Sequence, residues 1–198
     1  MKTRESGMPD EPIWQGFFDA PAVLARLQLG ASCRDVVDFG CGYGTFTIPA
    51  ARIVGGTVYA MDIDPAMIAA TEAKAAAAGL ANVRTLLRDF VAEGTGLPDA
   101  CVDYAMLLNI LHAECPEALL REAFRVLVPG GRLAIMHWNY DPATPRGPSM
   151  DIRPRPGQCR QWAEAAGFGL LAPGIIDMPP YHYGMVLERP KQKASGSQ

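Results

Sequence analysis

Hydrophobic positions alternate between two kinds of segment from residue 35 to about residue 138. Short apolar runs rich in β-branched residues are typical of buried strands, and the segments between them carry apolar residues at helical spacing. The predicted strands cover 36–39, 57–61, 83–88, 102–108 and 132–138, and the predicted helices cover 45–54, 65–78 and 116–127. Strands that alternate with helices favour a parallel sheet covered by helices on both faces.

The two ends of the chain depart from this pattern. Helical periodicity from Ile13 to Leu29 predicts a helical lead, within 1–34, that caps a domain covering 35–190. After a short helix over 158–166, two apolar segments, 170–176 and 181–188, follow with no room for a helix between them, so they should pair as an antiparallel hairpin. We therefore expect an α/β fold with a doubly wound, seven-stranded, mainly parallel sheet and an antiparallel C-terminal strand. The polar tail 191–198 should be disordered.

A segment rich in proline and arginine, 139–157, separates the fifth predicted strand from the last predicted helix. We expect it to be a substrate loop, and we expect Trp138, Tyr140 and Arg153 to contact the substrate. The guanidinium of Arg153 could hold a carboxylate or phosphate through two parallel hydrogen bonds. The alternative is a rigid surface loop with solvated arginines.

Composition and charge argue against several classes of protein. The formal net charge is −3, with 18 basic and 21 acidic residues, so nothing in the charge balance suggests attraction to nucleic acid or to an anionic membrane. No apolar run approaches the ~20 residues of a membrane-spanning helix. The five cysteines are scattered and never in C-x-x-C spacing, which indicates reduced thiols in a cytoplasmic protein and no metal site.

The candidate binding residues lie at the ends of the predicted strands. In an open parallel sheet, ligands bind beyond the carboxyl ends of the strands, where the strand order reverses. The first strand carries Asp38 and ends in a turn with glycines at alternate positions, Gly40, Gly42 and Gly44, where a ligand can approach the backbone closely. The dinucleotide fingerprint G-x-G-x-x-G would need a further glycine at Thr45, so this turn departs from it.

Polar side chains also follow the next three predicted strands. Asp62 lies 22 positions beyond Gly40, and its carboxylate can accept hydrogen bonds from both hydroxyls of a ribose. Asp89 and Asn109 follow the third and fourth strands. His112 and His137 fall just past strand ends, where either could deprotonate a substrate at neutral pH or serve only as a polar loop residue.

Together these segments resemble the motifs of class I S-adenosylmethionine-dependent methyltransferases, in the order and spacing of that family from about Asp35 to Trp138. The matching segments are Val37-Asp38-Phe39-Gly40-Cys41-Gly42-Tyr43-Gly44, Tyr59-Ala60-Met61-Asp62-Ile63-Asp64, Arg88-Asp89, Leu97-Pro98-Asp99-Ala100-Cys101-Val102-Asp103-Tyr104 and Leu127-Val128-Pro129-Gly130-Gly131-Arg132-Leu133. The resemblance is to the compact members of the family that act on small molecules.

The resemblance implies the cofactor S-adenosylmethionine and a set of residues that bind it. The methionine part is expected at Asp38, Gly40, Cys41, Gly42, Gly44 and Asn109, the ribose at Asp62, and the adenine at Ile63, Asp89 and Phe90. The implied function is methyl transfer to a small molecule, with the acceptor atom and the oligomeric state left open. Two alternatives remain, an NAD-dependent oxidoreductase and a non-catalytic subunit that binds S-adenosylmethionine.

Overall fold

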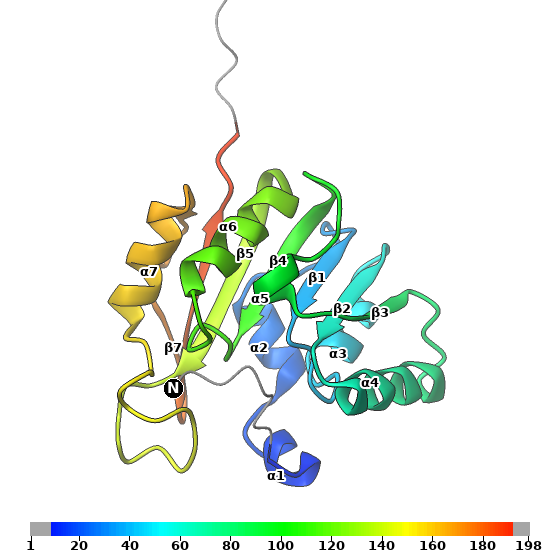
Figure 1. The fold of residues 1–198 in the computed structure, drawn as a ribbon, viewed down its shortest axis with the longest axis horizontal. Helices are drawn as coiled ribbons and strands as arrows, with labels where there is room; N and C mark the ends of the chain where they lie inside the picture. Colours follow the sequence, from blue (N-terminus) through cyan, green and yellow to red (C-terminus); the bar gives the residue numbers. More distant parts are fainter. Residues whose placement is uncertain (1–8, 192–198) are drawn as a thin grey trace, which may run out of the picture.

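The structure is a computed structural model that describes residues 9–191. Over these residues the chain forms an eight-stranded sheet with helices on both faces (Figure 1). The strand order is β3-β2-β1-β4-β5-β8-β6, and β7 also pairs with β8. The strands are β1 Val36–Phe39, β2 Val58–Asp62, β3 Val83–Leu87, β4 Val102–Leu108, β5 Leu127–Trp138, β6 Gly169–Leu170, β7 Ile176–Met178 and β8 His182–Glu188. The helices are α1 Glu11–Gln15, α2 Ala20–Arg26, α3 Thr47–Ile53, α4 Pro65–Ala77, α5 Phe90–Glu93, α6 Pro116–Val126 and α7 Pro156–Ala165.

The sheet confirms the predicted α/β class and the antiparallel C-terminal strand. Strands β1 to β5 are parallel, and β8 runs antiparallel to β5. The prediction of seven strands is wrong, because the segment 170–176 does not form one strand. A turn closed by the hydrogen bond from Gly174 N to Leu171 O (2.9 Å) interrupts it beside Pro173, which has no N–H to donate to a sheet. Two short strands, β6 and β7, therefore pair with different parts of β8.

The N-terminal periodic segment forms two helices where the sequence suggested one. Helix α1 ends at Gly16, and α2 begins after Asp19, whose side chain accepts a hydrogen bond from Ala22 N at 3.1 Å. Pro21 occupies the first turn of α2, a position that needs no N–H donor. Local capping therefore overrides the continuous hydrophobic pattern. The predicted tail 191–198 lies outside the described residues except for Lys191.

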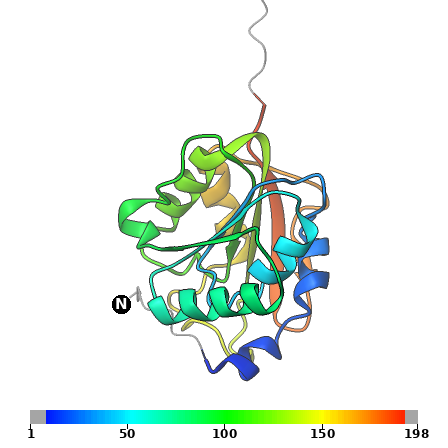
Figure 2. The ribbon, with the colours of Figure 1, turned by 90° about the vertical axis from the view of Figure 1, so that its right-hand side faces the viewer.

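Two hydrophobic cores lie on opposite faces of the sheet, between the sheet and the helices that cover each face (Figure 2 shows these helices). Neighbouring residues of one strand point to opposite faces. In β4, for example, Ala105 and Leu107 enter the core beneath α6 and α7, while Tyr104 and Met106 enter the core beneath α2 and α3. A strand buried on both faces explains the nearly continuous apolar runs in the sequence.

The strand order places a reversal point between β1 and β4. The chain moves outward from β1 to β2 and β3, and then crosses back to place β4 on the other side of β1. Helix α1 and the loop after β5 lie beyond the carboxyl ends of these strands (Figure 1). No helix within residues 9–191 is long and apolar enough to cross a membrane.

Candidate functional site

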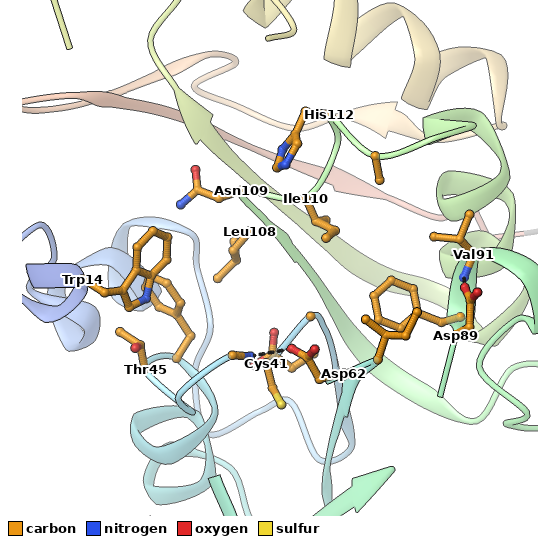
Figure 3. Close-up of a pocket in the computed structure, with 17 residues that line it drawn as sticks. Trp14, Cys41, Thr45, Asp62, Asp89, Val91, Leu108, Asn109, Ile110 and His112 are labelled. Carbon is orange, nitrogen blue, oxygen red and sulfur yellow. Dashed lines mark hydrogen bonds between the residues drawn. The ribbon is translucent and has the colours of Figure 1, made fainter. Parts of the chain in front are cut away.

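A pocket lies at the carboxyl ends of β1, β2 and β4, at the reversal point of the sheet (Figure 3). Ten of the residues singled out from the sequence line it: Asp38, Gly40, Cys41, Gly42, Asp62, Ile63, Asp89, Phe90, Asn109 and His112. The other lining residues are Trp14, Thr45, Phe46, Val91, Leu108, Ile110 and Ala113. The pocket thus brings together residues from the ends of four consecutive strands.

The glycine turn after β1 forms the floor of the pocket. The amides of Gly40 and Cys41 both donate to Met61 O, at 2.9 and 2.8 Å, which fixes the turn against the end of β2. Gly40 has a φ of +77°, and a Cβ there would lie 3.4 Å from Ile110 Cδ1 across the pocket. A side chain at this position would therefore both strain the backbone and occupy the pocket.

Gly44 serves the packing of the turn. It does not line the pocket, and a Cβ on it would lie 3.0 Å from Thr71 Oγ1 on α4. The same hydroxyl donates to Gly42 O at 2.9 Å, and Lys74 Nζ donates to Tyr43 O at 2.6 Å. Helix α4 thus holds the outer side of the turn.

Two buried carboxyl groups, Asp38 and Asp62, stand beside the turn. Asp38 accepts a hydrogen bond from Thr47 Oγ1 at 2.6 Å, and Asp62 accepts from Gly42 N at 2.9 Å and from Asp64 N at 3.0 Å. Burial raises the pKa of Asp38 to about 7, an effect opposed by the Thr47 hydrogen bond and increased by the charge of Asp62. Burial also raises the pKa of Asp62. Since both groups resist ionisation alone, this corner of the pocket favours a cationic or hydrogen-bond-donating ligand.

Two side chains in the pocket have buried polar atoms without a hydrogen-bond partner in the described structure. They are Thr45 Oγ1 and the carboxamide of Asn109, both its Oδ1 and its Nδ2. The Asn109 backbone adopts a φ of +58°, and its amide donates to Met136 O at 2.7 Å, so β5 fixes its position. A buried polar group without a partner costs about 1–3 kcal/mol, which a ligand with complementary groups would offset.

The end of the pocket beside Asp89 carries the apolar side chains of Phe90 and Ile63. Phe90 packs edge-on against Phe39 with ring centroids 5.6 Å apart, and Ile63 remains 37% exposed. Asp89 caps α5, because its Oδ1 accepts from Val91 N at 3.2 Å and from Ala92 N at 3.1 Å. Asp89 therefore both caps α5 and lines the pocket.

The two histidines have different surroundings. His112 follows β4 and lines the pocket, whereas His137, near the end of β5, is completely buried and does not reach it. Their facing ring nitrogens, His112 Nδ1 and His137 Nε2, are 3.3 Å apart. Burial and the neighbouring His112 ring hold the pKa of His137 well below its usual value.

Trp138 and Tyr140, predicted to contact the substrate, do not line the pocket. Trp138 is 2% exposed and packs against His182, with ring centroids 4.2 Å apart, and against Phe17 at 5.2 Å. Tyr140 lies beneath the guanidinium of Arg155, with 3.7 Å from Arg155 Cζ to the ring centroid. Trp138 thus contacts the N-terminal segment and β8, and Tyr140 contacts a residue of its own loop.

Arg153 is the internal anchor of the loop 139–157. Its side chain is 7% exposed, and its guanidinium donates to the carbonyl oxygens of Asn139 and Pro148 at 3.0 and 2.8 Å and to Thr144 Oγ1 at 2.5 Å. With its donors directed at the loop backbone, the geometry favours a structural role over a clamp for a substrate anion.

Trp14 is the pocket residue that the sequence pattern least suggested. It enters from α1, on the side of the pocket opposite Asp89 (Figure 3), although its periodicity had indicated packing onto the core. The Glu11–Lys74 ion pair and the hydrogen bond from Tyr43 Oη to Pro9 O (3.2 Å) hold this segment over the glycine turn. An aromatic residue in an amphipathic lead gives no signal that separates these two roles.

Comparisons with known proteins agree with this site. A family model described as a methyltransferase domain matches residues 36–131. The chain is 37% identical over 103 residues to nocamycin O-methyltransferase of Saccharothrix syringae, covering 51% of this chain and 36% of the relative. It is 35% identical over 124 residues to a ubiquinone biosynthesis O-methyltransferase of Xanthomonas oryzae pv. oryzae, covering 61% and 49%. The chain thus spans less than half the length of either enzyme.

A solved structure extends the likeness to nearly the whole chain. A SAM-dependent methyltransferase from Aquifex aeolicus superposes with a TM-score of 0.79 and 26% identity, covering 90% of this chain and 93% of its own. Residues 36–131 thus match a methyltransferase domain, and over nearly its whole length the chain is similar to a SAM-dependent methyltransferase, in agreement with the motifs of the class I family at the strand ends.

Proposed function

We propose that this protein transfers the methyl group of S-adenosylmethionine to an oxygen atom of a small molecule. The observation that carries the proposal is the corner of the pocket where Asp38 and Asp62 stand beside the glycine turn. Both carboxyl groups have raised pKa values because they are buried, so a ligand that brings an ammonium group or paired hydroxyls would stabilise their ionised forms.

The residues of the pocket fit the parts of S-adenosylmethionine. Asp38 suits the ammonium group, while Asp62, whose carboxylate retains further acceptor capacity, suits the ribose hydroxyls. The unpartnered groups of Thr45 and Asn109 offer a donor and acceptors to the remaining polar groups of the ligand. The apolar end with Ile63, Phe90 and Asp89 suits a flat base that carries an amine; these assignments are made by chemical complementarity.

The cofactor supplies an electrophilic methyl group whose leaving group is a neutral thioether. The chain must hold an acceptor oxygen in line with that group, roughly 3–3.5 Å away, and exclude water. Trp14, Asn109 and His112 border the part of the pocket beyond the glycine turn, where we propose that the acceptor binds.

The proposed class of acceptor follows the names of the relatives. The two relatives described above are both named as O-methyltransferases, one for nocamycin and one for ubiquinone biosynthesis. A small-molecule acceptor and a cytoplasmic location form part of the same proposal.

Calorimetry and a methyl-transfer assay test this proposal. We expect S-adenosylhomocysteine to bind and NAD not to bind, and labelled methyl to pass from S-adenosylmethionine to hydroxyl compounds in a panel. Asp62→Asn should weaken binding of S-adenosylhomocysteine by roughly 10-fold or more, because one acceptor for the ribose becomes a donor. Asp64→Asn is the matched control, since Asp64 caps α4 by accepting from Ala66 N and asparagine caps helices equally well.

The alternatives give different results in the same experiments. Binding of NAD without binding of S-adenosylhomocysteine would support an oxidoreductase and overturn the proposal. Binding of S-adenosylhomocysteine with no transfer to any hydroxyl compound would support a non-catalytic subunit.

A further inference from the structure

A pair of histidines joins the pocket to the buried part of the sheet. Strands β4 and β5 are parallel neighbours, with Leu108 beside Met136 in register, so the residues that follow them are brought together. His112 Nδ1 faces His137 Nε2 at 3.3 Å, a distance that fits a hydrogen bond between two imidazoles. His112 lies at the acceptor side of the pocket, next to Asn109 and Ile110 (Figure 3).

We propose that His112 is the general base that deprotonates a hydroxyl acceptor, and that His137 is a positioning residue that fixes the orientation and tautomer of His112. This inference rests on the proposed methyl transfer. It adds the acceptor class, a phenol or enol, and a role for a residue that does not touch the pocket.

The surroundings of His137 keep it neutral. Its ring is fully buried, and the titratable groups around it are His112, His182 and Arg153, all bases that oppose a second positive charge. The ring of Tyr183 stacks on it with centroids 6.3 Å apart. A neutral imidazole has one N–H and one lone pair, so when His137 accepts a hydrogen bond at Nε2 its own hydrogen lies on Nδ1, a buried nitrogen without a hydrogen-bond partner in the described structure.

The hydrogen bond between the rings links their tautomers. Two neutral imidazoles share a single hydrogen across the 3.3 Å contact, so only one of them donates. When His137 Nε2 accepts, the hydrogen resides on His112 Nδ1, and the lone pair of His112 is at Nε2. This is the tautomer that a base requires, in the same way that a hydrogen bond at one ring nitrogen sets the role of the other.

The reaction then balances without any other group. The acceptor hydroxyl gives its proton to His112 Nε2, and its oxygen forms a bond to the methyl carbon. The bond between that carbon and sulfur breaks with both electrons left on sulfur, which gives a neutral thioether. The positive charge passes from sulfonium to imidazolium, whose Nδ1–H donates more strongly to neutral His137, and the proton later leaves to water.

The substrate class follows from the strength of the base. An imidazole is most effective as a base when the group that it deprotonates has a pKa not far above that of the imidazolium ion. Phenols and enols meet this condition better than aliphatic alcohols do. Acceptors that are already ionised would gain little from His112.

The first test compares two substitutions of similar polarity. His137→Gln can set an amide oxygen near the site of Nε2, whereas His137→Asn is one methylene shorter and cannot reach His112. We expect His137→Gln to retain most of kcat and His137→Asn to lose up to about 100-fold in kcat, with the KM for S-adenosylmethionine unchanged. Tyr104→Phe is the control, because Tyr104 is also a fully buried polar residue but donates to Leu27 O in the core on the other face of the sheet.

The second test uses acceptors of graded acidity. We expect His112→Gln to lower kcat by about 10²–10⁴-fold with a simple phenol, and the loss to shrink with nitrophenols that are ionised at the assay pH. His137→Asn should show the same trend, and should add no further loss in a double variant with His112→Gln. Nitrogen NMR of the wild-type protein should find His112 protonated at Nδ1 and not at Nε2.

Several results would overturn the inference. They are equal kcat values for His137→Gln and His137→Asn, a loss that does not depend on the acidity of the acceptor, or a hydrogen on His112 Nε2. Measuring whether the wild type binds S-adenosylhomocysteine distinguishes an error in the roles of the histidines from an error in the proposed function. If the wild type binds it and methylates a phenol while both His137 variants keep full activity, only the role of His137 is wrong; if the wild type does not bind it, the proposed function is wrong.

Discussion

Asp38→Asn is expected to make the free protein more stable while it weakens the binding of S-adenosylhomocysteine. The pKa of Asp38 in the folded state is raised from 3.8 to about 7, chiefly because the group is buried. At about 1.4 kcal/mol per pH unit, ionised Asp38 therefore costs the folded state on the order of 4 kcal/mol above pH 7. Asparagine retains an oxygen that can accept the Thr47 hydrogen bond and carries no charge.

The pH dependence gives the sign of the effect. The folded state binds this proton more tightly than the unfolded state, so the favourable contribution is complete below pH 3.8 and is lost as the pH rises through 7. Urea unfolding of wild type and Asp38→Asn should therefore give similar free energies near pH 4, and should favour the variant increasingly up to pH 8. Asp62 contributes a pH dependence of the same sign to both proteins, and because its charge also raises the pKa of Asp38, the comparison includes the loss of their mutual repulsion.

Ligand binding should change in the opposite direction. If Asp38 receives the ammonium group of the ligand, Asp38→Asn should raise the Kd for S-adenosylhomocysteine roughly 10- to 100-fold, as expected for one hydrogen bond to a charged group. The wild-type Kd should fall as the pH rises through 7, because the carboxylate form binds the cation. Asp103→Asn is the control, since Asp103 accepts from Arg34 N and Asp35 N outside the pocket. A variant at Asp38 that is less stable than the wild type at pH 8 would refute the reasoning.

Three further substitutions test the site and its supports. Gly40→Ala should fold with a loss of about 1–2 kcal/mol, because φ is +77°, and should weaken cofactor binding in calorimetry more than it lowers the unfolding temperature. Arg153→Met should lower the free energy of unfolding by about 3 kcal/mol and raise proteolysis of the loop 139–157, because several loop carbonyl groups lose their donor; unchanged proteolysis would contradict this role. Burial opposes ionisation of Glu122, but hydrogen bonds from Arg125 and Thr95 lower its pKa to about 2, so its stabilising contribution is present above pH 4.5 and lost as the pH falls toward 2. Glu122→Gln should flatten the acid limb of stability between these values, as measured by thermal unfolding.

The parts of the molecule that the sequence predicts well are those fixed by local chemistry. The strand–helix alternation, and the cap and proline at Asp64 and Pro65, set β1 to β4 and α4 at nearly the predicted bounds, whereas β5 begins at Leu127, five residues before the predicted start. The ends of parallel strands meet at one edge of a sheet, so the positions after them could be assigned to a common pocket before any contact was known.

The parts that the sequence predicts poorly depend on contacts between distant segments. Periodicity cannot tell that Trp14 lines the pocket or that the Arg153 side chain binds its own loop, because Trp14 lies in an amphipathic helical segment and Arg153 in an irregular polar one. The burial of His137 depends on β8 covering β5, a pairing that joins residues more than 40 positions apart. Gly16 and Asp19 end α1 and begin α2, but the hydrophobic pattern continues through both positions and so does not predict the break.

The position of α1 makes the entrance of the pocket sensitive to salt. This helix has five residues and none of them is buried, so its attachment depends on a few contacts, among them the Glu11–Lys74 ion pair, in which both side chains are about one-third exposed. Dissolved ions screen a pair of this kind, whereas they hardly affect the sheet beneath it. Raising the ionic strength should therefore loosen α1, and with it Trp14 at the pocket, before it affects the glycine turn beneath.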